Sequence, residues 1–233
     1  MSTSTKPTLK PNEVRLKRGR LSWPHLFIPK AGKANDNGKA KKKYSFSLIF
    51  DKETDKAQRT ELSNAIRAAA SAKWPNHHVT FNGKTISGNE GQKPIVLKGI
   101  PIRDGAERAD KEGYDSTKWF INASEDGEDA DGNIIPGPAV IDGHGNDLDK
   151  HNKLIFGGCY AHAKVRVWCQ DNDFGKRVNL GYTGVMYAGK GEPFGNSGPS
   201  DAKEDFKDLI EEEKFDDDTP PAKPAEVDED DDL

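Results

Sequence analysis

Residues 160–169 alternate between two kinds of side chain, and no other feature constrains the fold of this chain as strongly. The odd positions are small or apolar: Ala161, Ala163, Val165, Val167 and Cys169. The even positions carry two aromatic rings among three basic or potentially basic groups: Tyr160, His162, Lys164, Arg166 and Trp168. A period of two predicts a β-strand with one face in the core and the other face turned outward.

The even face of this strand is a candidate nucleic-acid surface. Rings that stack on unpaired bases, interleaved with cations that contact phosphates, suit single-stranded nucleic acid, at about 1–3 kcal/mol per stacked base. The alternative is a solvated face whose two rings are covered by a neighbouring loop. Lys118-Trp119-Phe120 forms a second aromatic and basic cluster. Adjacent strand residues point to opposite faces, so we expect only one of Trp119 and Phe120 to face a ligand.

The rest of the chain predicts a mainly β (α+β) fold with one main helix. Alternation or short apolar runs between Gly, Asn and Pro predict strands at residues 13–23, 44–50, 79–81, 95–102, 118–123, 139–142, 154–170 and 177–187. In the second strand, Tyr44, Phe46, Leu48 and Phe50 are expected to point inward and Ser45, Ser47 and Ile49 outward. Many short, Gly-interrupted strands favour a small barrel over a parallel α/β sheet.

The helix is predicted over residues 51–74. Leu62, Ile66, Ala69 and Ala70 form its apolar stripe. Asp51 or Thr54 is the expected cap, and Trp74-Pro75 ends the helix.

Charge is distributed unevenly along the chain. Residues 1–50 hold twelve Lys and Arg residues against Glu13 and Asp36. Residues 201–233 hold sixteen Asp and Glu residues against four lysines, a net charge of −12, and the whole chain carries −4. Residues 1–200 therefore carry +8. A basic body joined to a polyanionic tail indicates that the body binds a polyanion and that the tail can compete for the same surface.

We expect three regions. Residues 1–11 are a disordered N-terminus, residues 12–195 are the folded domain, and residues 196–233 are a largely disordered acidic tail with a short helix at 203–215. Residues 30–43 form a mobile basic loop. The last six residues are candidates for docking into a basic pocket on a partner protein, or for lying over the body's own basic surface: Asp228, Glu229, Asp230, Asp231, Asp232 and Leu233.

The sequence predicts no catalytic residues, metal site or cofactor. Lys33 and Ala40 stand where a phosphate-binding loop requires Gly and Ser or Thr. The acidic residues between 142 and 149 lack a recognised metal-ligand spacing. Cys159 and Cys169 are expected to be free buried thiols in a reducing compartment. No apolar run has the length of a membrane span, so we expect a soluble intracellular protein.

Four segments resemble a family of phage proteins that was first catalogued without a function and is now regarded as single-stranded DNA-binding. They are residues 20–27, 43–50, 118–124 and 157–165, in the family's order, and the likeness spans residues 12–195. The resemblance implies an OB-type closed or partly open barrel that coats single-stranded DNA during phage replication, recombination or repair. The acidic tail is similar to those through which replicative single-strand binders recruit polymerases and helicases, although those often end in Phe and this sequence ends in Leu233.

Together these observations predict a non-enzymatic binder of single-stranded DNA, with weak duplex binding, in the cytoplasm of an infected bacterial host. Bases would stack on Tyr160, Trp168 and one of Trp119 and Phe120. Phosphates would lie near His162, Lys164, Arg166, Lys118, Arg15 and Lys17. The tail would dock phage or host replication proteins. The first alternative is an acidic-tailed phage structural or chaperone-like protein that mimics nucleic acid, and the second is an enzyme that acts on nucleic acid.

Overall fold

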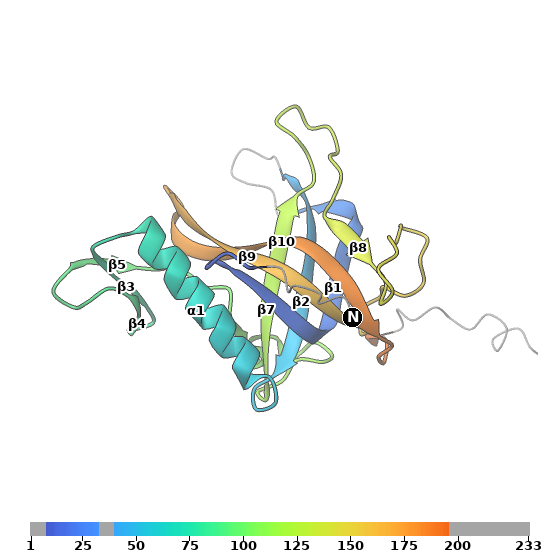
Figure 1. Ribbon diagram of the computed structural model, residues 1–233, viewed down its shortest axis with the longest axis horizontal. Coiled ribbons are helices and arrows are strands. Elements are labelled where there is room, and N and C mark those ends of the chain that lie inside the picture. Colours follow the sequence, from blue (N-terminus) through green and yellow to red (C-terminus); the bar gives the residue numbers. More distant parts are fainter. Residues whose placement is uncertain (1–7, 33–39, 196–233) are drawn as a thin grey trace, which may run out of the picture. The chain divides into compact units, whose positions relative to one another are not determined.

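The computed structural model describes residues 8–32 and 40–195, and its strands form two sheets (Figure 1). The seven-stranded sheet has the order β6-β7-β2-β1-β9-β10-β8, and the three-stranded sheet has the order β4-β3-β5. The elements are β1 (Glu13–Ala31), β2 (Lys42–Asp51), α1 (Lys56–Lys73), β3 (His77–Phe81), β4 (Lys84–Ser87), β5 (Lys93–Val96), β6 (Arg103–Asp104), the 3₁₀ helix η1 (Gly105–Arg108), β7 (Lys118–Asp126), β8 (Ala139–Ile141), β9 (Tyr160–Asn172) and β10 (Gly175–Gly189).

The large sheet curls so that β7 and β10 lie close together, although they are not hydrogen-bonded neighbours in the sheet. The main-chain N–H of Tyr182 on β10 donates to Oε1 of Glu125 on β7 at 2.9 Å. We call this line between β7 and β10 the seam. The fold is therefore mainly β with one helix, in the partly open form of the predicted OB-type barrel.

The barrel interior is filled by alternate residues of its strands. On β9 the odd-numbered residues from Ala161 to Val167 are buried, so the predicted alternation is confirmed. On β2, Tyr44, Phe46, Leu48 and Phe50 are buried in the same core, also as predicted. Both strands owe their orientation to these apolar rows, because a shift of one residue would expose them to water.

A second, smaller cluster covers the other face of β2 and β7. It consists of Ile49, Tyr114 and Phe120, with Phe194 packed against it. Ile49 points away from the barrel interior, as predicted. It is nevertheless buried, because this second cluster covers it. Ser47 is buried as well. Both faces of β2 are thus covered over part of its length.

The helix α1, which is the one α-helix among the described residues, buries its predicted stripe: Leu62, Ile66, Ala69 and Ala70. The predicted start is wrong, because β2 continues to Asp51 and α1 begins only at Lys56. The carboxylate of Asp51 accepts hydrogen bonds from the main-chain N–H groups of Glu53 and Thr54, so it caps the turn that precedes the helix. Asp55 occupies the N-cap position without a side-chain hydrogen bond to the main chain of the first turn, and Thr54 is not the cap.

Two predicted strands are shorter in the structure. The strand expected over 95–102 is reduced to β5, and the chain at Lys98 and Gly99 instead makes main-chain hydrogen bonds with β10. The strand expected from 154 begins at Tyr160, after a turn in which Gly158 has a φ of 111°. A Cβ at Gly158 would lie 2.0 Å from a main-chain oxygen, so only glycine fits there. β4, β6 and η1 were not predicted.

Several predictions fall outside the described residues. They concern the N-terminal residues 1–7, the centre of the 30–43 loop and the whole tail, including the helix at 203–215 and the last six residues. The chain divides into the units Met1–Gly198 and Pro199–Leu233, and all described residues belong to the first.

Candidate nucleic-acid interface

A concavity of about 590 Å³ lies along the seam, and we call it the seam groove. One side is formed by β2 and β7, the other by β9 and β10, and residues of the segment 99–108 also line it. The aromatic, cationic and polar side chains that line it include Trp23, Lys43, Ser47, Arg103, Arg108, Asn122, Trp168 and Arg177. Aromatic, cationic and neutral polar groups therefore meet on one concave surface.

Trp23 reaches this groove because β1 bulges. Ser22 pairs with Ser47 and His25 pairs with Ser45, so β1 has one residue more than β2 over this interval. Trp23 adopts a φ of 46°, which is uncommon for a large side chain. Pro24 follows it and cannot donate a hydrogen bond to a ladder. The indole is 43% exposed. A bulge re-aims a side chain, and this one turns a tryptophan out of the sheet.

Arg108 lies within an aromatic cluster at the groove. Its guanidinium carbon is 5.0 Å from the ring centre of Trp23, 5.5 Å from that of Tyr114 and 4.4 Å from that of Phe120. The Trp23 and Tyr114 rings stack at 5.6 Å with an interplanar angle of 27°. Arg108 also donates to the hydroxyl oxygens of Ser47 at 3.4 Å and Tyr114 at 3.3 Å. These contacts hold the cation in place before any ligand arrives.

The guanidinium carbon of Arg103 also lies near Phe120, 5.3 Å from its ring centre. Its Nε donates to the Glu107 carboxylate at 2.9 Å. The first turn of η1 orients this pair, since Asp104 and Glu107 form a capping box. β6 and the short helix thus present two arginines, Arg103 and Arg108, at the groove.

Trp168 stands on the opposite side of the groove. Its indole is 42% exposed on the outward face of β9, and its register partner on β10 is Asn179. Arg177, also on β10, lines the groove and is exposed. The prediction that Trp168 points outward is confirmed. The seam groove therefore has a half-exposed tryptophan and an arginine on each side.

Neutral polar groups lie between the two tryptophans. Ser47 on β2 donates from its hydroxyl to Oδ1 of Asn122 on β7 at 2.6 Å. Ser45 and Ser124 line the same surface. Hydroxyl and amide groups offer both donors and acceptors to a base edge or a sugar.

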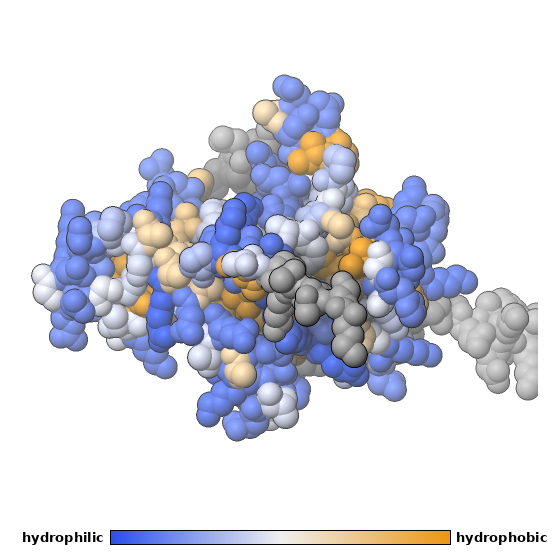
Figure 2. All heavy atoms as spheres, in the orientation of Figure 1, coloured by the Kyte–Doolittle hydropathy of each residue, from blue (hydrophilic) through white to orange (hydrophobic). Residues whose placement is uncertain are grey.

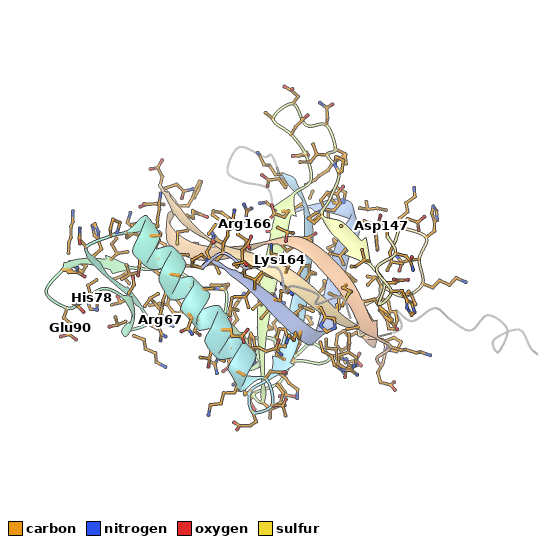
Figure 3. All side chains as sticks on the ribbon, viewed as in Figure 1. Arg67, His78, Glu90, Asp147, Lys164 and Arg166 are labelled. Atoms are coloured by element: carbon orange, nitrogen blue, oxygen red, sulfur yellow. The ribbon has the colours of Figure 1, made fainter. Side chains whose placement is uncertain are left out.

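The cations predicted on β9 and β7 each have an acidic neighbour. Lys164 lies 3.2 Å from Glu13, Arg166 lies 3.4 Å from Glu125, and Lys118 lies 2.9 Å from Asp51. Lys164 and Arg166 follow one another along β9 (Figure 3). Lys118 lies at the far end of β7 and does not line the seam groove. These side chains are partly exposed, so water and salt screen the ion pairs and leave them weak.

His162 and Tyr160 contact Arg18 on the neighbouring strand. The main-chain N–H of Arg18 donates to Nδ1 of His162 at 3.1 Å, so the ring proton of a neutral His162 is on Nε2. Burial, helped by Arg18 and Lys17, lowers the pKa of His162, and the ring is therefore neutral at neutral pH. The Arg18 guanidinium lies 4.8 Å from the ring centre of Tyr160. Arg18 already occupies a place that a stacked base would need.

The positions of Trp119 and Phe120 differ from the expectation that one of their rings faces a ligand. Trp119 is fully buried in the main core, where it stacks on Phe50 at 4.5 Å. Phe120 is fully buried in the second cluster, edge-on to Tyr114. The expectation that one of the two faces a ligand is wrong, because both faces of β7 are covered at this point. Phe120 reaches the groove only indirectly, through the arginines above it.

The described residues hold no group of three or more His, Cys, Asp or Glu side chains that could bind a metal ion. Asp142 is engaged within its own loop, where it accepts hydrogen bonds from His144 and Asn146. Both cysteines are free. Burial raises the pKa of Cys169 to about 11, so its thiol stays protonated. Over residues 8–32 and 40–195, no helix has the length and hydropathy of a membrane span.

Sequence reasoning missed Trp23, Arg103, Arg108 and Arg177. Trp23 could have been found, because the observed strand continues through a Trp-Pro pair, and proline within a strand signals a bulge. It also lies in a segment that carries the family resemblance. The arginines carry no such signal, since their positions depend on how η1 and the β9–β10 hairpin meet across the seam.

A curled, mainly antiparallel sheet with aromatic and cationic side chains in a surface groove is typical of the oligonucleotide-binding class of β-barrels. The comparison with protein families gives the particular family. A family model described as "Enterobacter phage Enc34, ssDNA-binding protein" matches residues 12–219, and the chain belongs to this family.

Solved structures agree in fold. The single-stranded DNA-binding protein from bacteriophage Enc34 in complex with ssDNA is 23% identical, with a TM-score of 0.60. The match covers 83% of this chain and 100% of that one. The same phage protein without the complex is 22% identical with a TM-score of 0.56, over 80% of this chain and 86% of that one. None of the curated proteins matches.

Proposed function

We propose that this chain binds single-stranded DNA in the seam groove and is not an enzyme. One observation carries the proposal: two half-exposed tryptophans, Trp23 and Trp168, line one groove together with Arg103, Arg108 and Arg177. Rings of this kind stack on unpaired bases whatever their sequence, and arginines contact phosphates or stack on bases. Membership of a family named for ssDNA binding supports the same function.

The outward face of β9 extends the path. Beyond Trp168, the side chains of Arg166 and Lys164 continue along the strand, and Arg15 and Lys17 lie beside them on β1. We propose these four, with His162, as weaker phosphate contacts. Glu13 and Glu125 must give up their ion pairs with Lys164 and Arg166 for such contacts to form. Tyr160 and Lys118 remain proposed contacts with less support, because Arg18 covers one and Asp51 pairs with the other.

At its other end the groove approaches the tip of the β9–β10 hairpin. Phe174 sits at this tip and is 66% exposed. Lys98 Nζ donates to the main-chain oxygen of Phe174 at 3.2 Å, which fixes the turn. We propose that Phe174 stacks on a base of a strand long enough to leave the groove.

The test is a set of tryptophan substitutions. Trp23→Ala and Trp168→Ala should each weaken binding to oligo-dT by about 1–3 kcal/mol, the range for one stacked base. Quenching of tryptophan fluorescence should come from these two rings, because Trp74 and Trp119 are buried. Ile134→Ala, an exposed residue that does not line the groove, is the matched control.

Unchanged affinity in a folded double variant, Trp23→Ala with Trp168→Ala, would show that the groove is not the binding site. A chain that leaves oligo-dT unbound but holds another protein in solution would instead support the structural or chaperone-like alternative. Shortening of the oligonucleotide when a divalent metal is supplied would favour an enzyme.

We further propose the cellular role. The folded domain, residues 12–195, would coat single strands during replication, recombination or repair in the cytoplasm of a phage-infected bacterium, with weaker binding to duplex. The acidic residues 196–233 would recruit phage or host replication proteins, polymerase or helicase, through residues 228–233. Their net negative charge, against a positively charged remainder, supports competition with DNA. Deletion of residues 216–233 should tighten binding to oligo-dT and abolish recruitment. Weaker binding after deletion contradicts the competition.

A further inference from the structure

A second concavity, of about 500 Å³, lies on the outer face of β1, β9, β10 and β8, and we call it the outer groove. It shares no lining residue with the seam groove. Its shape follows from two bulges that flank β9. On β1, an extra residue between Leu16 and Gly19 places Arg18 at a φ of 52°. On β10, Thr183 is the extra residue between Tyr182 and Gly184. Bulges bend their strands, and here they leave β9 between two bent neighbours.

The floor of the outer groove is aliphatic. Ala139 and Ile141 of β8 and Met186 of β10 line it, and each is partly or fully exposed to solvent. Figure 2 shows apolar atoms gathered near the β8 side of the molecule, bordered by hydrophilic residues. This floor differs from the seam groove, whose exposed apolar side chains are tryptophans.

The walls of the outer groove are cationic. Arg15 and Lys17 of β1 and Lys164 of β9 line it, together with His162. Lys164 is within 3.2 Å of Glu13, and His162 accepts a hydrogen bond from the main chain of Arg18. A ligand of the outer groove therefore needs negative charge to match the rim and apolar groups to match the floor.

We propose that the outer groove is a docking site for an acidic peptide segment that carries bulky apolar side chains. The carboxylates of such a segment match the cations at the rim, and its apolar side chains match the floor. A nucleobase fits less well, because Met186 and Ile141 offer no flat face on which a base could stack. Methionine suits a peptide site since its flexible side chain adapts to different partners.

The sequence of this chain contains a segment with the required chemistry. In residues 203–215, Phe206, Leu209 and Ile210 have helical spacing among six acidic residues. The family model extends through this stretch to residue 219. A synthetic peptide of residues 203–215 is therefore a suitable probe, supplied as a separate molecule.

The test titrates the fluorescent peptide with the full-length chain and follows its anisotropy. The peptide should bind, and Met186→Asp and Ile141→Asp should each weaken binding about tenfold, because a carboxylate in the floor repels the acidic ligand and removes apolar contact. Affinity for oligo-dT should fall less than affinity for the peptide, since the floor residues do not line the seam groove and the cations at the rim are proposed only as weaker phosphate contacts. Ile134→Asp adds the same charge elsewhere and is the control.

Two comparisons separate the possible failures. A peptide with Phe206, Leu209 and Ile210 replaced by Ser keeps its charge and should not bind; equal binding would mean attraction by charge alone and overturn the proposal. If the floor variants weaken the binding of oligo-dT as much as the binding of the peptide, the outer groove is part of the DNA path instead. Met186→Ala, which removes only the aliphatic chain, should weaken peptide binding several-fold. This variant keeps the test valid if the Asp variants fail to fold. Absence of peptide binding to the unmodified chain also overturns the proposal, and leaves the DNA-binding proposal untouched.

Discussion

Asp51 ends β2, and its partly buried carboxylate makes several polar contacts. It accepts from Lys118 Nζ at 2.9 Å and from the main-chain N–H groups of Glu53 and Thr54 at 2.8 and 3.1 Å. The Lys118 hydrogen bond first, and these N–H groups second, lower the pKa of Asp51 to about 2 from an ordinary value of 3.8. A carboxyl group with a lowered folded-state pKa stabilises the fold above its unfolded pKa and loses this effect as pH falls.

We predict that Asp51→Asn makes the protein less stable at neutral pH and reduces the loss of stability between about pH 4 and pH 2. Urea unfolding measured across this pH range checks the prediction. Asp126→Asn, which removes the carboxylate of the exposed Lys43 ion pair, is the control and should change little. If the free energy of unfolding falls between about pH 4 and pH 2 as steeply in Asp51→Asn as in the unmodified protein, the stabilising role of the Asp51 carboxylate is contradicted.

Two buried tyrosines allow a matched pair of substitutions. Tyr44 donates its hydroxyl to the main-chain oxygen of Ile135 at 2.9 Å. The Tyr182 hydroxyl is buried without a hydrogen-bond partner among the described residues. Tyr44→Phe should therefore lower the free energy of unfolding by about 1 kcal/mol, whereas Tyr182→Phe should leave it unchanged or raise it. Denaturant unfolding distinguishes the two, and a loss of more than about 1 kcal/mol in Tyr182→Phe would contradict the prediction.

For single residues, the sequence predicted the face to which a side chain points better than it predicted the groups that the side chain contacts. The outward positions of Trp168 and Arg166 follow from alternation alone, because the strand has one apolar row. Alternation could not predict the burial of both Trp119 and Phe120, since a second cluster covers the other face of β7. Nor could it predict that Arg18 lies over Tyr160, because that contact requires the bulge in β1.

Among the elements, the β9–β10 hairpin contributes most to the proposed interface. It carries Trp168 and Arg177 into the seam groove and Phe174 at its tip. A strand that fills only the groove should not reach the tip. We predict that Phe174→Ala leaves affinity for a short oligo-dT unchanged and weakens a longer one by about 1–3 kcal/mol, the value of one stacked base.

A length series of oligo-dT measured by fluorescence quenching checks this prediction. Val96→Ala is the control, because Val96 is an exposed apolar residue on β5 that lines neither groove. Equal affinities for every length in Phe174→Ala would place the hairpin tip outside the DNA path.

Element type was predictable, but element boundaries were not. The apolar stripe of α1 is visible in the sequence, and so is the alternation of β2 and β9. The start of α1 was missed because Asp51, an acceptable cap, serves a turn at the end of β2 instead. β6 and η1 carry Arg103 and Arg108, and elements of two and four residues are too short for any periodic signal.

For the whole molecule, the net positive charge of residues 1–200 predicts how affinity for single-stranded DNA depends on salt. Affinity for single-stranded DNA should fall with salt, with a log–log slope near 0.7 for each phosphate that is neutralised. Lys43→Ala at the seam groove should reduce this slope by about that amount. Lys84→Ala, on β4 and outside both grooves, should not. Titrations at several salt concentrations check this, and a flat response in the unmodified protein would contradict the phosphate contacts.

The seam has a consequence for how the barrel accommodates a ligand. Glu125 links the two edges by accepting from the Tyr182 N–H and facing Arg166, and a Cβ at Gly181 would lie 2.1 Å from its carboxylate oxygen. Paired strands are held by a ladder of main-chain hydrogen bonds, whereas these two edges are joined through the Glu125 side chain and the core packing beneath it. We therefore expect the seam, rather than a hydrogen-bonded part of the sheet, to yield first when a larger base enters the groove.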